Sequence, residues 1–200
     1  ALVAYIVGSS QQLAIMIFST PLVYAVIFAP LIYIVFFSRN LMSMSKEQAI
    51  FHLSTFAALN GLSLGSIFLV YTTASIAKTF FITASTFGVM SLYGYSTKKD
   101  LTSLGSFAYM GLIGLVIASL INLFLRSPAL DFAVSFIGVG IFTILTAYDT
   151  QKLKSIYYSM NGTTARAGSI AVYGALTLYL DFINLFTMLL HFFGVRKDND

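Results

Sequence analysis

Two aspartates in apolar surroundings are the residues of this sequence with the clearest potential for chemistry. Asp181 lies fifteen positions from Arg166 and fifteen from Arg196, and no other acidic or basic residue separates those arginines except His191. In a helix rising about 1.5 Å per residue, Asp181 would lie about 22 Å from either arginine, near the middle of a bilayer about 30 Å thick. A carboxyl group at that depth is costly and indicates a function.

The polar residues on either side of Asp181 follow a helical spacing. Steps of three and four place one set on a single helical face: Gly174, Thr177, Asp181, Asn184, Met188 and His191. Leucine, isoleucine, phenylalanine and tyrosine occupy the opposite positions. Because lipid cannot satisfy polar groups, we expect this stripe to face protein or a water-filled cavity.

Asp149 ends a second polar face, on which Thr143, Thr146 and Asp149 recur at steps of three. If the two faces meet, two carboxyl groups in one apolar site cannot easily both ionise, so they would share a proton and titrate as a pair. Other interpretations stay open. Asp149 could instead pair with Lys152 or Arg39, and Asp181 could be a permanently protonated acid bonded to Asn184 or a nearby hydroxyl.

Composition narrows the class of protein. Hydrophobic residues make up 58% of the 200, charged residues only 9%, and the mean hydropathy is +0.88, which predicts an integral membrane protein in contact with the lipid bilayer. The net charge is +4, but the basic residues are scattered, so we expect no nucleic-acid partner.

The sequence favours no enzyme class. Without cysteine there are no thiolate ligands or nucleophiles, and the HExxH and GxSxG motifs are absent. His52 and His191 fall toward opposite ends of their apolar runs, which disfavours a shared metal. An intramembrane aspartyl protease needs two aspartates at similar depth, whereas Asp181 is central in its run and Asp149 terminal. We therefore expect neither catalysis nor a cofactor.

Apolar runs separated by short polar breaks predict an all-α integral membrane protein with seven transmembrane helices in a single domain over residues 1–200. The expected spans are 1–8, 13–37, 49–71, 76–95, 104–125, 132–148 and 167–195, with a long loop over 150–164. The first run is short and opens at Ala1 without a methionine, so we expect a truncated first helix. Pro30 should kink the second helix rather than end it.

Lysine and arginine are unequally divided between the two sides of the predicted bundle. One side carries Arg39, Lys46, Lys98, Lys99, Lys152, Lys154 and Arg166, and the other carries Lys78 and Arg126 in its connections. By the positive-inside rule the richer side is cytoplasmic. This places the N-terminus in the cytoplasm and the C-terminus outside.

Three stretches of the chain resemble the Bax inhibitor-1 family, also called the transmembrane Bax inhibitor motif family, and in particular its bacterial inner-membrane members. They are SIAKTFFITASTFGVMSLYGYSTKKDL (75–101), LTAYDTQKLK (145–154) and GALTLYLDFINLF (174–186). The resemblance implies a central seventh helix surrounded by the other six. It also implies a di-aspartyl pH sensor, here Asp149 and Asp181, and a pH-dependent calcium leak in which both aspartates are candidate calcium contacts.

The family pattern adds an arginine that latches the sixth-helix aspartate, for which Arg39 is the candidate here. Some bacterial members also carry an acid in the second helix, whereas this chain has none over 13–37, and its single glutamate is Glu47. The missing acid weakens the expectation of calcium permeation more than that of the proton sensor. The alternative is a stress-survival protein that modulates a membrane-anchored quality-control protease, with structural aspartates. A proton-coupled transporter would use the same acids but lacks an evident substrate site.

Overall fold

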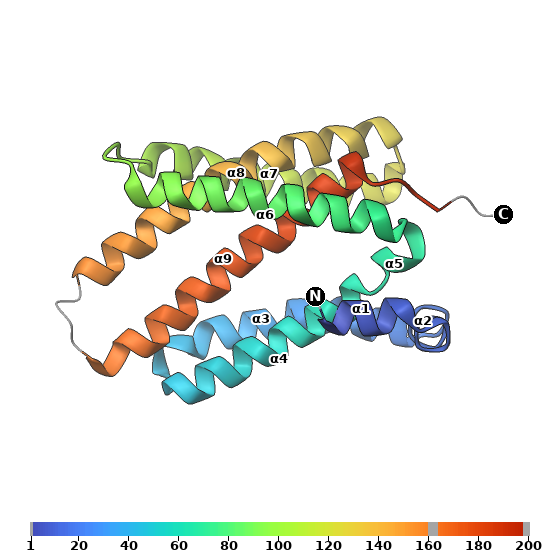
Figure 1. The fold of residues 1–200 in the computed structure, drawn as a ribbon, viewed down its shortest axis with the longest axis horizontal. Helices are drawn as coiled ribbons and strands as arrows, with labels where there is room; N and C mark the ends of the chain where they lie inside the picture. Colours follow the sequence, from blue (N-terminus) through green and yellow to red (C-terminus); the bar gives the residue numbers. More distant parts are fainter. Residues whose placement is uncertain (1, 160–163, 198–200) are drawn as a thin grey trace. The chain divides into compact units, whose positions relative to one another are not determined.

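The computed structural model describes residues 2–159 and 164–197, which form helices and no strand apart from one isolated bridge between Tyr71 and Arg196 (Figure 1). The elements are α1 (Leu2–Ser9), α2 (Gln11–Phe18), α3 (Leu22–Asn40), the 3-10 turn η1 (Leu41–Ser43), α4 (Lys46–Leu64), α5 (Ile67–Val70), α6 (Thr73–Ser96), α7 (Thr102–Leu125), α8 (Pro128–Ser159) and α9 (Thr164–Phe193).

Six helical segments in the described part of the chain are long and apolar enough to cross a membrane. They are Leu22–Ser43, Lys46–Val70, Thr73–Ser96, Thr102–Leu125, Pro128–Ser159 and Ala167–Phe193. Large apolar side chains such as Phe124, 87% exposed, and Leu92, 69% exposed, cover their outer faces. Side chains of this kind are satisfied by lipid rather than water. The protein is therefore an all-helical integral membrane protein.

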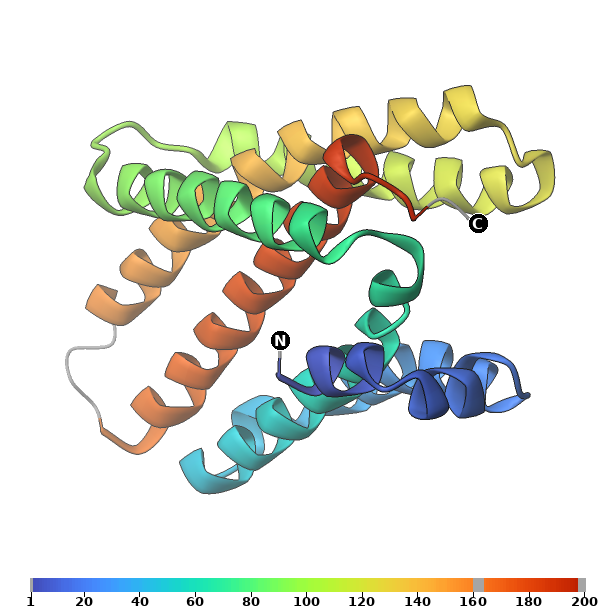
Figure 2. The ribbon, with the colours of Figure 1, turned by 45° about the vertical axis from the view of Figure 1, so that its right-hand side comes forward.

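The chain divides into two compact units. The first comprises residues 1–76, 163–173 and 195–200, and its described part contains α1 to α5 and the beginning of α9. In this unit α3 packs on α4, and α1 lies along α4 (Figure 2). Gly61 and Gly65 permit the close approach of α1, because a Cβ at either position would crowd Val3 or Val7. The end of the chain joins this unit where Lys197 donates its N–H to the carbonyl of Val70 at 2.9 Å.

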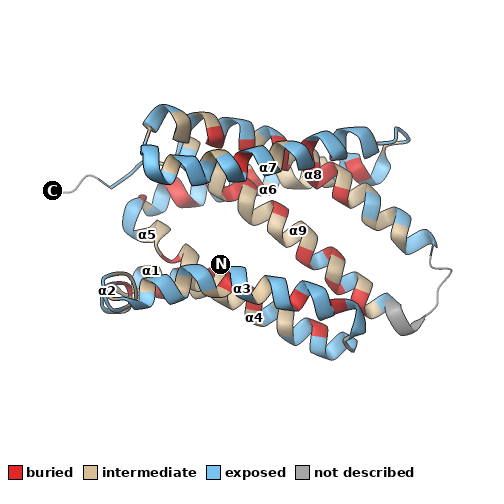
Figure 3. Ribbon diagram, turned by 180° about the vertical axis from the view of Figure 1, so that it is seen from behind, coloured by how far each residue is buried: buried red, intermediate tan, exposed pale blue. Residues whose placement is uncertain are grey.

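The second unit comprises residues 77–162 and 174–194, with most of α6, all of α7 and α8, and the greater part of α9. Buried positions recur along α8 and α9 (Figure 3). Its core joins three helices through Ala108, Leu115, Val134, Ile141, Phe142, Leu145, Leu185 and Leu189. Phe182 and Phe186 of α9 pack edge-on against Phe80 of α6, with ring centroids 5.7 and 6.3 Å apart. In this unit α9 therefore contacts α6, α7 and α8.

The N-terminal part of the chain differs from the continuous helix predicted over 13–37. Helix α2 ends at Phe18, and α3 begins at Leu22, directly after Pro21. Proline lacks the N–H that a continuing helix needs, but it suits the start of a new one. Pro30, in contrast, lies inside α3, as predicted. The predicted span over 1–8 corresponds to α1 (Leu2–Ser9), which is too short to span a membrane by itself.

The predicted loop over 150–164 is wrong over its first ten residues, because α8 continues to Ser159. Leu153 and Ile156 keep helical spacing with the buried residues before them, and lysine and glutamine are good helix formers. The polar residues after Asp149 indicate where this helix leaves the apolar region, but the helix itself continues beyond them. Residues 160–163 lie outside the described part. A single domain and a seven-helix count stay predictions.

Candidate functional site

Asp149 of α8 and Asp181 of α9 lie together in the second unit. Their carboxyl groups are within hydrogen-bond reach of each other. Both residues are buried, with exposed fractions of 3% and 5%. The structure thus brings together the two aspartates that the sequence places on separate polar faces.

The helical spacing around each aspartate explains how they meet. A Cβ added at Gly174 would lie 3.2 Å from the side chain of Leu153, and one at Gly138 would lie 2.9 Å from that of Met188. Along α9 the contacting residue number rises from 174 to 188 while along α8 it falls from 153 to 138, so the helices run antiparallel. The aspartate pair lies between these two contacts, and small residues allow the close approach that sets its position.

The environment of Asp181 determines what the pair can do. Its Oδ2 is buried, and no donor in the described part of the chain gives it a hydrogen bond. A carboxylate accepts but cannot donate, so Asp149 and Asp181 can hydrogen bond to each other only if one of them carries a proton. Two adjacent negative charges in an apolar site repel strongly. The arrangement is therefore suited to holding one proton between two acids.

Tyr109 of α7 is a partner of this pair that the sequence reasoning missed. Its hydroxyl donates to Asp149, at 3.1 Å from Oδ1 and 3.2 Å from Oδ2. Its ring packs edge-on against Tyr148, with centroids 6.0 Å apart. A hydroxyl-bearing aromatic residue within an apolar run was the available signal, since buried tyrosine hydroxyls usually find a partner. No spacing rule links a residue on α7 to one on α8.

The two predicted support residues, Lys152 and Asn184, differ in their contacts. Lys152 acts on Asp149 as a nearby positive charge, while its Nζ lies over the Tyr148 ring, 5.7 Å from the centroid. Asn184 donates its amide to the backbone carbonyl of Leu180 at 2.9 Å. Thr143 and Thr146 likewise donate to carbonyls four residues earlier on α8. Asn184, Thr143 and Thr146 are thus satisfied within their own helices.

Comparison with known proteins now places the chain in a family. Residues 1–198 match the family model described as inhibitor of apoptosis-promoting Bax1. The chain belongs to the Bax inhibitor-1 family. It is 46% identical to inner membrane protein YbhL of Escherichia coli over 199 residues, which is 98% of this chain and 85% of YbhL.

Two further relatives of this Bax inhibitor-1 family member come from other bacteria. A protein of Rickettsia prowazekii is 50% identical over 183 residues, covering 92% of this chain and 77% of its own length. A protein of Caulobacter vibrioides is 50% identical over 179 residues, covering 90% of this chain and 72% of its own. The resemblance inferred from the three sequence stretches is confirmed.

Two further candidate residues of this family member, Arg39 and His52, lie in the first unit. Arg39 is exposed in the last turn of α3, and its contact with Asp149 stays a prediction. His52 of α4 hydrogen bonds through Nδ1 to the Tyr33 hydroxyl at 2.6 Å and stacks on Phe37. Within residues 2–159 and 164–197, no three metal-ligating side chains are grouped to hold an ion.

Proposed function

We propose that this protein is a pH-sensitive cation leak, with calcium as the permeant ion and the Asp149–Asp181 pair as its gate. The observation that carries the proposal is the contact between two buried carboxyl groups on two membrane-spanning helices. Membership of the Bax inhibitor-1 family supports it, because the resemblance implies a di-aspartyl sensor at these positions. Intramembrane acids of this kind mark ion and proton pathways.

The gate works through the number of protons on the pair. With one proton shared, a hydrogen bond between the carboxyl groups holds α8 to α9, and the remaining negative charge accepts from Tyr109 and attracts Lys152. Acidification adds a second proton and removes that charge. The interactions holding Asp149 then weaken, α8 shifts against α9, and a path opens beside α9. Arg39 is the family-based candidate for a further latch on Asp149.

The surrounding architecture is part of the same proposal. It comprises seven helices with α9 at the centre, a cytoplasmic N-terminus and an outer C-terminus. The relative YbhL is named an inner membrane protein, and we place this chain in the same membrane. Helix α3 has no acid within its span, so the permeant ion would depend on the aspartate pair rather than on a second-helix carboxylate.

The test is ion flux into liposomes that contain the purified protein. Calcium and potassium uptake are measured over a pH series for wild type, Asp149→Asn and Asp181→Asn. We expect calcium flux to rise on acidification in wild type and to lose its pH dependence in each variant. Identical, pH-independent flux in all three proteins would contradict the proposal and leave the aspartates a structural role, as the protease-modulator hypothesis requires.

A further inference from the structure

A basic pocket lies in the second unit where the 97–101 connection meets α8. Its volume is about 460 Å³, and its lining includes Lys98, Lys99, Asp100, Gln151, Lys152 and Ser155. That volume falls within the usual range for small-molecule sites. Asp149 and Asp181 do not line the pocket, although Lys152 of its lining also acts on Asp149.

The charges of this pocket favour an anion. Lys98, Lys99 and Lys152 are exposed, and the lining therefore holds three positive charges and the single negative charge of Asp100. The Asp100 carboxylate is already engaged, because its Oδ1 accepts from the Thr102 N–H at 2.9 Å and from the Thr102 hydroxyl at 2.6 Å. The neighbouring Lys154 is engaged as well, since its Nζ donates to the Tyr95 carbonyl at 2.6 Å. Lys98 and Lys99 are left to attract a ligand, while the charge of Lys152 also acts on Asp149 and its Nζ lies over the Tyr148 ring.

Gln151 holds the pocket in shape. Its Oε1 accepts from the Leu101 N–H at 2.9 Å, and its Nε2 donates to the Lys99 carbonyl at 2.8 Å. Both bonds run from one α8 side chain to the backbone of the 97–101 connection. They fix the backbone beside the lysines before any ligand arrives, which lowers the ordering cost of binding.

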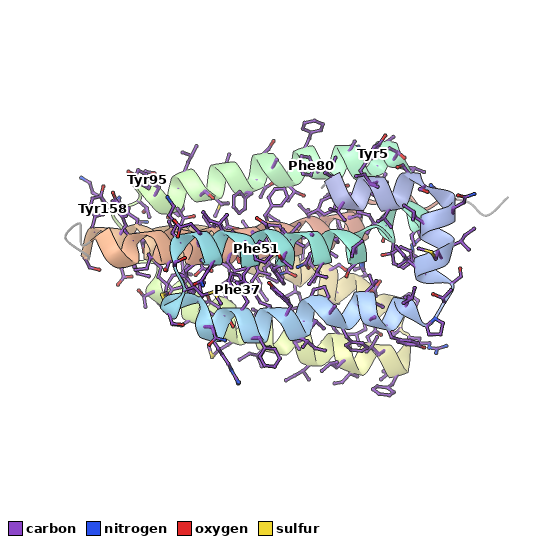
Figure 4. The ribbon with its side chains drawn as sticks, turned by 90° about the horizontal axis from the view of Figure 1, so that it is seen from below. Tyr5, Phe37, Phe51, Phe80, Tyr95 and Tyr158 are labelled. Atoms are coloured by element: carbon purple, nitrogen blue, oxygen red, sulfur yellow. The ribbon has the colours of Figure 1, made fainter. Side chains whose placement is uncertain are left out.

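The pocket lies at the membrane boundary. The candidate span containing α6 ends at Ser96, and the next begins at Thr102, so Lys98 and Lys99 fall between two spans. Tyr95 and Tyr158 lie close together at this end of the second unit (Figure 4). Tyrosine gathers where apolar chains meet polar headgroups.

We propose that this lysine pocket binds the phosphate of an anionic phospholipid headgroup. Lysine ammonium groups bind phosphate as point charges, and basic pockets between helices at the membrane surface select anionic lipids. Ser155 and Gln151 supply hydrogen-bonding groups within the same lining. Because the boundary position places lipid phosphates at this depth, a lipid is favoured over free phosphate.

The test compares lipid retention by charge-matched variants. The full chain is reconstituted in nanodiscs with equal amounts of phosphatidylglycerol and phosphatidylcholine, released into detergent, and analysed for bound lipid by native mass spectrometry. The pocket variant is Lys98→Gln with Lys99→Gln. The control is Lys78→Gln with Lys197→Gln, which removes the same charge outside the pocket. A Lys98→Arg with Lys99→Arg variant keeps the charge in place.

We expect wild type, the control and the arginine variant to retain more phosphatidylglycerol than phosphatidylcholine. In the glutamine pocket variant, this ratio should fall about fivefold for each lysine removed. Equal retention of the two lipids by wild type, or an equal loss in the control, would overturn the proposal. A final arm titrates inorganic phosphate into lipid-depleted protein. Binding there that depends on Lys98 and Lys99, without any lipid preference, would overturn the lipid assignment. None of these outcomes depends on ion flux.

Discussion

Tyr109 donates its hydroxyl to Asp149, 3.1 and 3.2 Å from the two carboxylate oxygens, and so connects α7 to the aspartate pair between α8 and α9. A donor aimed at a carboxyl group stabilises its charged form. The proton balance of the pair therefore depends on a third helix as well as on the two that carry it.

Replacing Tyr109 by phenylalanine removes only this hydroxyl. We expect the free energy of unfolding to fall by about 1.5–3 kcal/mol, the usual range for a hydrogen bond to a charged group. Without the donor, Asp149 loses a hydrogen bond that only its charged form accepts, so the pH midpoint of calcium flux should rise. Flux into liposomes over a pH series measures the midpoint. Tyr148→Phe removes a hydroxyl next to Tyr109 and is the matched control. An unchanged midpoint in Tyr109→Phe would show that the hydrogen bond does not influence gating.

The close approach of α6 to α8 depends on Gly94. A Cβ there would overlap the backbone carbonyl of Ala147, which cannot rotate away as a side chain could. We expect Gly94→Ala to cost about 1–3 kcal/mol in stability and, because Ala147 lies two residues from Asp149, to disturb gating as well. Thermal unfolding in detergent measures the loss. Gly88→Ala on the same helix meets nothing within 4 Å and should not destabilise. Equal unfolding temperatures for the two variants would contradict the packing argument.

Asp100, which lies outside the spanning segments, should make the stability of the folded protein depend on pH. Hydrogen bonds from the Thr102 side chain and backbone hold the pKa of its carboxyl below the ordinary 3.8. A lowered pKa in the folded protein stabilises it above the ordinary pKa, and this contribution disappears as the pH falls through the folded value. Thr102→Val removes the hydroxyl donor, so the Asp100 pKa should rise toward 3.8. Carboxyl carbon NMR titration measures it, with Ser103→Ala as control. A Thr102→Val pKa no higher than that of wild type would refute this account.

The sequence predicted the features that depend on residue spacing within a single helix. Steps of three and four placed Asp181 on one face and Asp149 on another, and the depth of Asp181 in its apolar run indicated that it was buried. The break before Leu22 was missed because hydropathy does not distinguish a proline at a helix start from one inside a helix. The end of α8 was misplaced because Lys152 and Lys154 are polar yet favour helix.

Two contacts between helices could not be predicted from the sequence. The Tyr109 hydroxyl reaches Asp149 across forty positions, and Gln151 reaches the backbone of Leu101 across fifty. Neither pair follows a helical period. In the sequence, Lys98 and Lys99 indicated only which side of the membrane this connection lies on. Their place in a pocket depends on how α8 lies beside the 97–101 connection.

The most direct test of the gate is a double-mutant cycle on the pH response of flux. The ratio of calcium flux at acidic to that at neutral pH is measured for wild type, Asp149→Asn, Asp181→Asn and the double variant. If the two carboxyl groups act as one proton-sharing unit, each single substitution should abolish the pH response as completely as both together. Single variants that each keep part of the response, with effects that multiply in the double variant, would contradict a shared proton.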